Sequence, residues 1–320
     1  MKNCLLLLIV IASISFSQFS LTIDRIGNAK RAGEENTFRA TLLNDGKIIR
    51  TIERKIPFDV PFPSSSINES TGIWVLTYAF DGFVEVYNAQ GIKMWEQNFF
   101  KEMGPNYERT ITVALGKTSI AFLTSDVTLS NAMVHQFTTD GAKTSETSLP
   151  YSLGYEIAMA HDEKTIVAGS YVVANGIVQH STRIIETKGN IEGNVNILFR
   201  KAAFSEDNKF IVLTSDREVV IVSRDSQKEV SRTSTKTDGI ITDVIWNEEN
   251  VIIQESTVHV NPETAFYYSN PTFIHYSKKL KELQHQSIEV PSFKISTLRK
   301  NGNSVQFRYN QKSIPILLKQ

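Results

Sequence analysis

The sequence predicts an all-β fold, and three observations lead to this prediction. From residue 66 onward, short runs of four to eight residues rich in Val, Ile, Thr, Phe and Tyr alternate with clusters of Gly, Asn, Asp, Ser and Lys. Such runs are typical of β-strands separated by turns. No stretch shows the 3.6-residue spacing of apolar residues that an amphipathic helix requires. The composition, with 41% apolar and 10% aromatic residues, is that of a folded chain.

A repeated turn gives these strands a period. One polar turn precedes a buried-looking strand six times, 41 to 53 residues apart, at Gly72, Lys117, Lys164, Lys209, Asn250 and Asn303. A second turn recurs in phase with the first, at residues 44–46, 88–91, 139–141, 187–189, 224–226 and 277–279. Most second turns contain the Asn, Asp or Gly that tight hairpins need. Each unit is thus two hairpins, or four strands, and a period of about 40 to 50 residues predicts a β-propeller.

Two of these units resemble blades of known propeller families. AAFSEDNK at residues 202–209, followed by FIVLTSDREVVIVSRDSQKEV, resembles a WD-repeat blade. Residues 72–96, which contain VEVYNAQGIKMWEQ, are similar to blades of the pyrroloquinoline-quinone type. In that type, a turn glycine precedes a tryptophan docked between neighbouring blades. The resemblance covers most of residues 37–310, concerns architecture only, and implies that Trp95 docks between two blades.

The ends of the chain predict how the ring closes. The repeat begins with a second hairpin, over residues 38–56, and ends after a first hairpin, over residues 293–309. We therefore expect six blades, with the N- and C-terminal segments completing one blade together, because a shared blade removes unpaired sheet edges. Residues 21–26 and 313–318 also look like strands, so seven blades is the alternative. Residues 18–320 are expected to form a single propeller domain.

The first 17 residues have the pattern of a secretory signal peptide. Lys2 precedes an apolar run over residues 4–14, and the small residues Ser15 and Ser17 follow at the positions that a signal peptidase recognises. The run is shorter than the roughly 20 residues of a transmembrane helix, although an uncleaved anchor is the alternative. We expect cleavage near Ser17 and an exported protein, whether secreted, periplasmic or in the cell envelope, with no membrane insertion. Its mature chain would contain no cysteine, since Cys4 is the only one.

Charge and motifs disfavour several classes of function. The 34 basic and 34 acidic residues balance, whereas nucleic-acid binders and polybasic membrane-surface proteins need an excess of cations. The six histidines have no spacing that would place two on one face of a strand or helix. The sequence also has no nucleophile elbow, glycine-rich phosphate loop or Asp-rich calcium loop. We therefore predict no catalytic residue, no metal and no cofactor.

Aromatic residues concentrate in the connections that are predicted to open on one face of the ring. These connections link successive blades and link the two hairpins of a blade. The candidate ligand- or partner-binding residues are Phe62, Phe100, Tyr107, Tyr151, Tyr267 and Tyr268. Large rings with polar groups are favoured where proteins recognise ligands or other proteins. The alternative is that these rings pack over the ends of the blades as part of the core.

The sequence favours an exported, non-enzymatic binding or scaffolding protein that recognises a protein or another extracellular ligand through this face. The alternative is an exported propeller enzyme of the lactonase, lyase or dehydrogenase type, with polar residues from several blades meeting in the central channel. Three polar strand ends, Phe80-Asp81, Ser125-Asp126 and Ser215-Asp216, would line the mouth of such a channel. Their other interpretation is that they cap turns through local hydrogen bonds.

Overall fold

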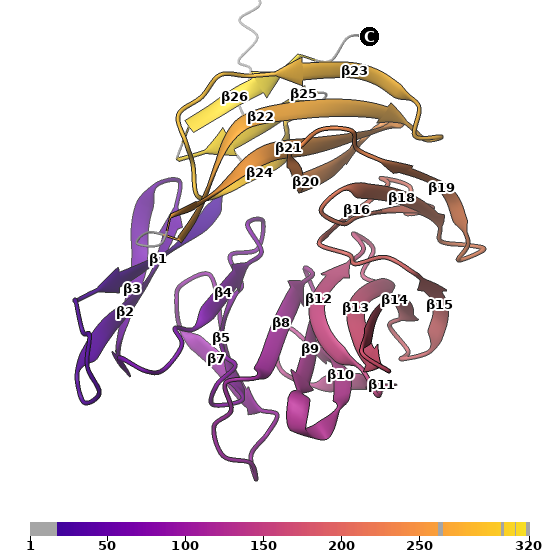
Figure 1. The fold of residues 1–320 in the computed structure, drawn as a ribbon. Coiled ribbons are helices and arrows are strands. Elements are labelled where there is room, and N and C mark those ends of the chain that lie inside the picture. Colours follow the sequence, from indigo (N-terminus) through magenta and orange to yellow (C-terminus); the bar gives the residue numbers. More distant parts are fainter. Residues whose placement is uncertain (1–17, 262–264, 302–303, 311, 318–320) are drawn as a thin grey trace, which may run out of the picture.

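A computed structural model describes residues 18–261, 265–301, 304–310 and 312–317, so the predicted signal peptide lies outside the described residues. The described chain forms seven antiparallel sheets that follow one another around a ring (Figure 1). Its one helical element is the 3₁₀ turn η1 (Val127–Leu129). In this part of the chain, no helix is long and apolar enough to cross a membrane. The all-β prediction is confirmed.

In every sheet, strands that are neighbours in the sequence are neighbours in the sheet. Sheet 1 contains β1 (Phe19–Ile26), β2 (Glu35–Asn44) and β3 (Lys47–Pro57). Sheet 2 contains β4 (Ser64–Ile67), β5 (Trp74–Tyr78), β6 (Phe83–Tyr87) and β7 (Lys93–Asn98). Sheet 3 contains β8 (Arg109–Leu115), β9 (Ser119–Asp126), β10 (Asn131–Thr138) and β11 (Lys143–Pro150).

The remaining sheets continue the same pattern around the ring (Figure 1). Sheet 4 contains β12 (Leu153–Met159), β13 (Thr165–Ala174), β14 (Ile177–Glu186) and β15 (Ile191–Val195). Sheet 5 contains β16 (Lys201–Phe204), β17 (Phe210–Thr214), β18 (Glu218–Ser223) and β19 (Glu229–Ser234). Sheet 6 contains β20 (Ile240–Asn247), β21 (Asn250–Asn261), β22 (Ala265–Ser277) and β23 (Glu282–Ser287). Sheet 7 contains β24 (Ser296–Asn301), β25 (Ser304–Tyr309) and β26 (Lys312–Ile316).

The number of sheets and the way the ring closes differ from the six-blade prediction. β1 pairs with β2, and β26 pairs with β25, so each terminal hairpin gains a third strand and forms its own sheet. The predicted shared blade is wrong, because no described strand of sheet 1 pairs with a strand of sheet 7. A strand that pairs with its neighbour in sequence closes a short loop, which costs less entropy than joining the two chain ends. The seven sheets agree in number with the alternative prediction.

Apolar side chains are buried between successive sheets. Six clusters of buried side chains are present in the described chain, and each joins one sheet to the next, from sheets 1 and 2 through to sheets 6 and 7. Strands in the middle of the ring are therefore apolar on both faces, as in β17 and β18 of sheet 5. In sheet 1, by contrast, β1 and β3 are mostly exposed.

Trp95 on β7 docks onto the following sheet, as the resemblance implied. Its indole Nε1 donates a hydrogen bond to the carbonyl oxygen of Thr139 at 2.9 Å, in the second turn of sheet 3. The ring lies 5.4 Å from the ring of Phe137. A side chain at Gly141, where φ is +98°, would meet the indole at 3.0 Å. The glycine in this turn therefore leaves room for the tryptophan of the preceding sheet.

The junction between sheet 7 and sheet 1 is polar. Arg299 of β24 forms an ion pair with Glu69 of sheet 2, in the turn between β4 and β5 that lies next to the start of β1. Gln18 lies between the two sheets, donating to Glu69 Oε2 at 3.0 Å and accepting from Arg308 Nη2 at 3.1 Å. None of the apolar clusters in the described residues spans this junction. Side-chain hydrogen bonds therefore close the ring where all other junctions have an apolar core.

Replacing the docked tryptophan should weaken the fold. Trp95→Ala is expected to lower the free energy of unfolding by about 3 kcal/mol, the low end for a tryptophan because the ring is half-buried. Met94→Ala is the control, since Met94 is exposed on the other face of the same strand. Urea unfolding followed by tryptophan fluorescence and circular dichroism measures both. Equal midpoints for the two variants would contradict the docking role.

The polar junction should make the terminal sheets the least protected. Native-state hydrogen exchange is expected to be faster for the paired amides of β2 and β25 than for those of β13 and β17. The reason is that sheets 4 and 5 have apolar clusters on both faces, whereas sheets 1 and 7 have one on a single face. Uniform protection in all seven sheets would show that the ring opens only as a whole.

Candidate functional site

The ring has two faces, which we distinguish by their connections. Because neighbouring strands are antiparallel, the first and second turns of each unit open on one face, the turn face. The opposite face, here called the link face, carries the connections between second and third strands and between successive sheets. These connections include residues 58–63, 99–108, 127–130, 151–152, 175–176, 196–200, 215–217 and 288–295. Two long hairpins, β13–β14 and β21–β22, also project on this face.

A buried ion pair organises residues 99–108, the connection between sheets 2 and 3. Arg109 Nε donates to Asp126 Oδ2 at 3.1 Å, and neither side chain is exposed to solvent. The other guanidinium nitrogens donate to the carbonyl oxygens of Phe80 and Gly104, at 3.1 and 3.0 Å. Asn106 Nδ2 donates to Asp126 Oδ1 at 3.0 Å. The strand end at Asp126 therefore has a structural role in organising this loop.

Burial by itself would raise the pKa of Asp126. Hydrogen bonds from the hydroxyl and the backbone N–H of Thr128 and from Arg109 and Asn106 outweigh this effect and hold the pKa below its ordinary value. The carboxylate is thus charged in the folded protein and balances Arg109. The guanidinium carbon also lies 4.2 Å from the centre of the Phe100 ring.

The predicted aromatic residues lie in different surroundings. Phe100 is buried in the core between sheets 2 and 3. Phe62 is half-buried, 5.9 Å from the ring of Phe38, and packs onto the core of sheets 1 and 2. These two rings occupy the positions that the core alternative described. Tyr107 is 61% exposed, and its hydroxyl donates to the carbonyl oxygen of Asp59 at 2.8 Å.

The two tyrosines of β22 are half-buried on the long hairpin of sheet 6. Tyr267 stacks on His259 of β21, with ring centres 4.7 Å apart. Tyr268 stacks on Phe293, and the backbone N–H of each of these two residues donates to the carbonyl oxygen of the other, at 2.7 and 2.9 Å. This bridge ties the hairpin to the connection leading into sheet 7. The structure thus brings Tyr267 and Tyr268 together but leaves Tyr151 on the other side of the link face.

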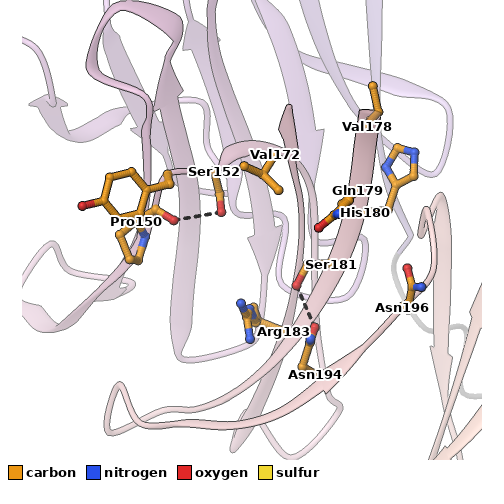
Figure 2. A pocket seen from close by; sticks show the side chains of 11 residues that line it. Pro150, Ser152, Val172, Val178, Gln179, His180, Ser181, Arg183, Asn194 and Asn196 are labelled. Carbon is orange, nitrogen blue, oxygen red and sulfur yellow. Dashed lines mark hydrogen bonds between the residues drawn. The ribbon is translucent and has the colours of Figure 1, made fainter. Parts of the chain in front are cut away.

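Tyr151 stands at a hollow between sheets 3 and 4. Its side chain is 81% exposed, and its backbone has φ +57°, in the left-handed region. The first hollow, of about 630 Å³, is lined by Pro150, Tyr151, Ser152, Val172, Val178, Gln179, His180, Ser181, Arg183, Asn194 and Asn196. Arg183 and Asn194 lie at one end of it, and Val178 and His180 at the other (Figure 2). Among the described residues, no acidic side chain lines this hollow.

Two further hollows adjoin the first along the link face. The second hollow, of about 620 Å³, shares His180 and Asn196 with the first and adds Arg217, Glu218 and Arg232. The third hollow, of about 530 Å³, is lined by residues in or next to the first strands of sheets 4 to 7, which are β12, β16, β20 and β24. The long hairpin of sheet 6 also lines it, through Val258, Phe266 and Tyr268. This hollow shares Asp216 and Ile240 with the second. The three hollows share lining residues in sequence, and we call them together the trough, which runs over sheets 3 to 7.

The third hollow holds the most perturbed carboxyl of the trough. Burial raises the pKa of Glu156 on β12, and the positive charges of Lys201 and Arg200 offset this only in part. Arg200 Nε lies 3.3 Å from Asp216 Oδ1. Lys294 also lines the hollow. Among the described residues, no three His, Cys, Asp or Glu side chains are grouped so that they could hold a metal ion.

Sequence reasoning missed most residues of the trough. Arg183, Gln179 and Asn194 occupy alternate, outward-looking strand positions that resemble ordinary solvent-facing residues. Of the six candidate binding residues, Tyr151 and Tyr268 line a hollow of the described chain. Ser215 and Asp216, which were predicted either to line the mouth of a channel or to cap a turn, line the second hollow. The available signal was the length of β13 and β14, which extend well beyond the five residues of β15. A long strand pair beside a short one leaves part of a face uncovered.

Known structures show the same architecture. No protein-family model matches the chain, and no curated protein matches it in sequence. A chain in the crystal structure of the mitotic checkpoint complex has 10% identity and a TM-score of 0.58, covering 98% of this chain and 95% of that one. The dihydro-heme d1 dehydrogenase NirN, in complex with DHE, has 11% identity and a TM-score of 0.57, covering 94% of this chain and 61% of its own.

A third similar structure is hydrazine synthase from Kuenenia stuttgartiensis, with 11% identity and a TM-score of 0.53, covering 78% of this chain and 74% of that one. These structures contain propellers, and at such low identity they speak for the fold alone. The chain therefore has a β-propeller architecture. Proteins with this architecture include both binding proteins and enzymes.

Loss of the buried charge pair should destabilise the fold. Asp126→Asn is expected to cost about 3–5 kcal/mol at neutral pH, because Arg109 is left buried without its counter-ion. Since the folded pKa is depressed, the contribution of Asp126 is present above pH about 4 and is lost as the pH falls through the folded value. The wild type and the variant should thus converge in stability at low pH. Asp81→Asn, at the equivalent exposed strand end, is the control in urea titrations at pH 7 and pH 2.5.

Proposed function

We propose that this chain is an exported β-propeller that binds an extracellular ligand in the trough of the link face. The trough is the observation that carries this proposal, because three adjoining hollows offer concave surface within the usual range of ligand sites, about 300–1,000 Å³ each. The sequence pattern of residues 1–17 supports export.

The surroundings of the trough support a binding role. Several large apolar side chains on the link face are at least half exposed, among them Tyr107, Leu129, Tyr151, Ile177, Val178, Phe266 and Ile295. Rings and aliphatic side chains at the edge of a concave surface are typical of recognition sites. Because they are at least half exposed, these side chains contribute little to the packing of the sheets.

Filling the first hollow should abolish ligand binding without unfolding the protein. Ser181→Trp places a large ring in the hollow, and Ile92→Trp places the same ring on the turn face as a control. A thermal-shift screen against extracellular saccharides, peptides and metabolites is expected to give ligands that raise the melting temperature of the wild type and of Ile92→Trp. The same ligands should have no effect on Ser181→Trp. Ligands that stabilise all three proteins equally would place binding elsewhere.

Export makes a separate prediction. The mature protein from its native source should begin near residue 18, because the small residues Ser15 and Ser17 fit a peptidase site. N-terminal sequencing of the protein from the extracellular or envelope fraction measures this. An intact residue 1 in that fraction would favour the uncleaved anchor.

A channel enzyme is the second candidate, favoured by Glu156. A carboxyl with a raised pKa beside Lys201 in a hollow has the environment of a general acid. Under this alternative, Glu156→Gln abolishes turnover of a ligand found in the screen and leaves its affinity unchanged. If the wild-type protein leaves every such ligand chemically intact, the binding function stands alone.

A further inference from the structure

We infer that the first and second hollows bind an acidic oligosaccharide, whose sugar units carry carboxylate groups. This inference rests on the proposed binding function and assigns a ligand class to it. It is carried by the side chains that line the two hollows, and above all by their unpaired hydrogen-bond donors.

Arg183 is the anchor for a carboxylate. It lies on β14 directly opposite Asn194 of β15, and its guanidinium makes no ion pair or hydrogen bond with the residues that the structure describes. No acidic side chain of the described chain lines the hollow to neutralise it. A guanidinium offers a planar, two-pronged set of N–H donors that matches a carboxylate. Arg183 can therefore pair with an anion in the hollow.

The remaining polar groups match hydroxyls. Ser181 Oγ donates to Asn194 Oδ1 at 2.7 Å, which fixes that amide and leaves its N–H groups free to donate. The side-chain amides of Gln179 and Asn196 have no hydrogen-bond partner among the described residues, and each can both donate and accept. His180 also lines this hollow, with its Nδ1 enclosed by the protein. Sugar hydroxyls, which also donate and accept, satisfy such a set.

Tyr151 provides the apolar surface that a sugar ring needs. Its ring is 81% exposed at the edge of the first hollow, and the aromatic contacts within the described chain do not include it. An aromatic face packs against the C–H groups of a pyranose while the hydroxyls point sideways to polar partners. A peptide ligand would instead favour an apolar pocket for an anchoring side chain. Val172 and Val178 supply only a small apolar surface here.

The second hollow extends the site to further sugar units. His180 and Asn196 line both hollows, so a linear chain can pass from one to the other. The acids of the second hollow are already paired, Asp216 with Arg200 at 3.3 Å and Glu218 with Arg232 at 3.0 Å. Arg217 is exposed there, and its guanidinium has no partner in the described chain. It provides a second anchor for a carboxylate.

Isothermal titration of the full mature protein tests this inference. A linear tetrasaccharide of glucuronic acid is expected to bind at least tenfold more tightly than cellotetraose, its neutral counterpart. Arg183→Met should weaken this binding about tenfold to hundredfold, as expected for hydrogen bonds to a charged group. Tyr151→Ala should weaken this binding severalfold. Arg217→Met should lower the affinity for the tetrasaccharide but not the affinity for glucuronic acid itself. Arg39→Met, in the exposed pair of sheet 1, is the matched control and should bind as the wild type does.

Three results would overturn the inference. The first is equal binding of cellotetraose and the acidic tetrasaccharide. The second is that Arg183→Met and Tyr151→Ala both bind the acidic tetrasaccharide as tightly as the wild type does and have the same melting temperature as the wild type. The third is tighter binding of tetraglutamate than of the tetrasaccharide, which would make the ligand an acidic peptide. If a different ligand from the screen binds the wild type but not Ser181→Trp, and no acidic sugar binds, the proposed function stands and this inference fails.

Discussion

Burial of apolar side chains between one sheet and the next is the interaction on which the rest of this structure depends. Strands such as β17 and β18 are apolar on both faces, so a single sheet of this kind has no stable existence in water. Each of sheets 2 to 6 is therefore held by apolar packing against both of its neighbours, and the repeat places the same packing requirement every 41 to 53 residues. Docked groups such as Trp95 fix the angle between one sheet and the next.

This packing leaves the connections free to differ. On the turn face they are short and polar, because each has only to reverse the chain. On the link face, the loop at residues 99–108 is organised by its own buried ion pair, and the hairpins of sheets 4 and 6 project beyond the core. Arg183 and Asn194 lie opposite each other on strands whose next residues, Ile184 and Val195, are packed in the core between sheets 4 and 5. The candidate site thus combines a rigid support with side chains that no packing requirement restrains.

The architecture could be predicted from the sequence, whereas the site could be predicted only in part. Turns at fixed spacing report on backbone conformation, and Asn, Asp and Gly there have local reasons to occur. The docking of Trp95 was predicted from the resemblance of residues 72–96 to a known type of blade. The blade count was harder, since β1 and β26 decide it through pairing that depends on loop entropy rather than on composition. Arg183 and Glu156 matter because of what surrounds them, and only the assembled sheets create those surroundings.

The polar junction between sheets 7 and 1 has a consequence for how the molecule responds to load and heat. Six apolar interfaces connect the seven sheets in order, whereas the first and last sheets meet only through polar contacts that involve Arg299, Glu69 and Gln18. In terms of stability, the molecule therefore resembles a linear repeat protein whose two ends are in contact. Terminal repeats of such a protein unfold first, because each has only one stabilising interface. The terminal repeats here are sheets 1 and 7, which are neighbours in the ring. High salt screens the contact between them, so the ring can part there while the middle sheets, which carry most of the trough, keep their shape.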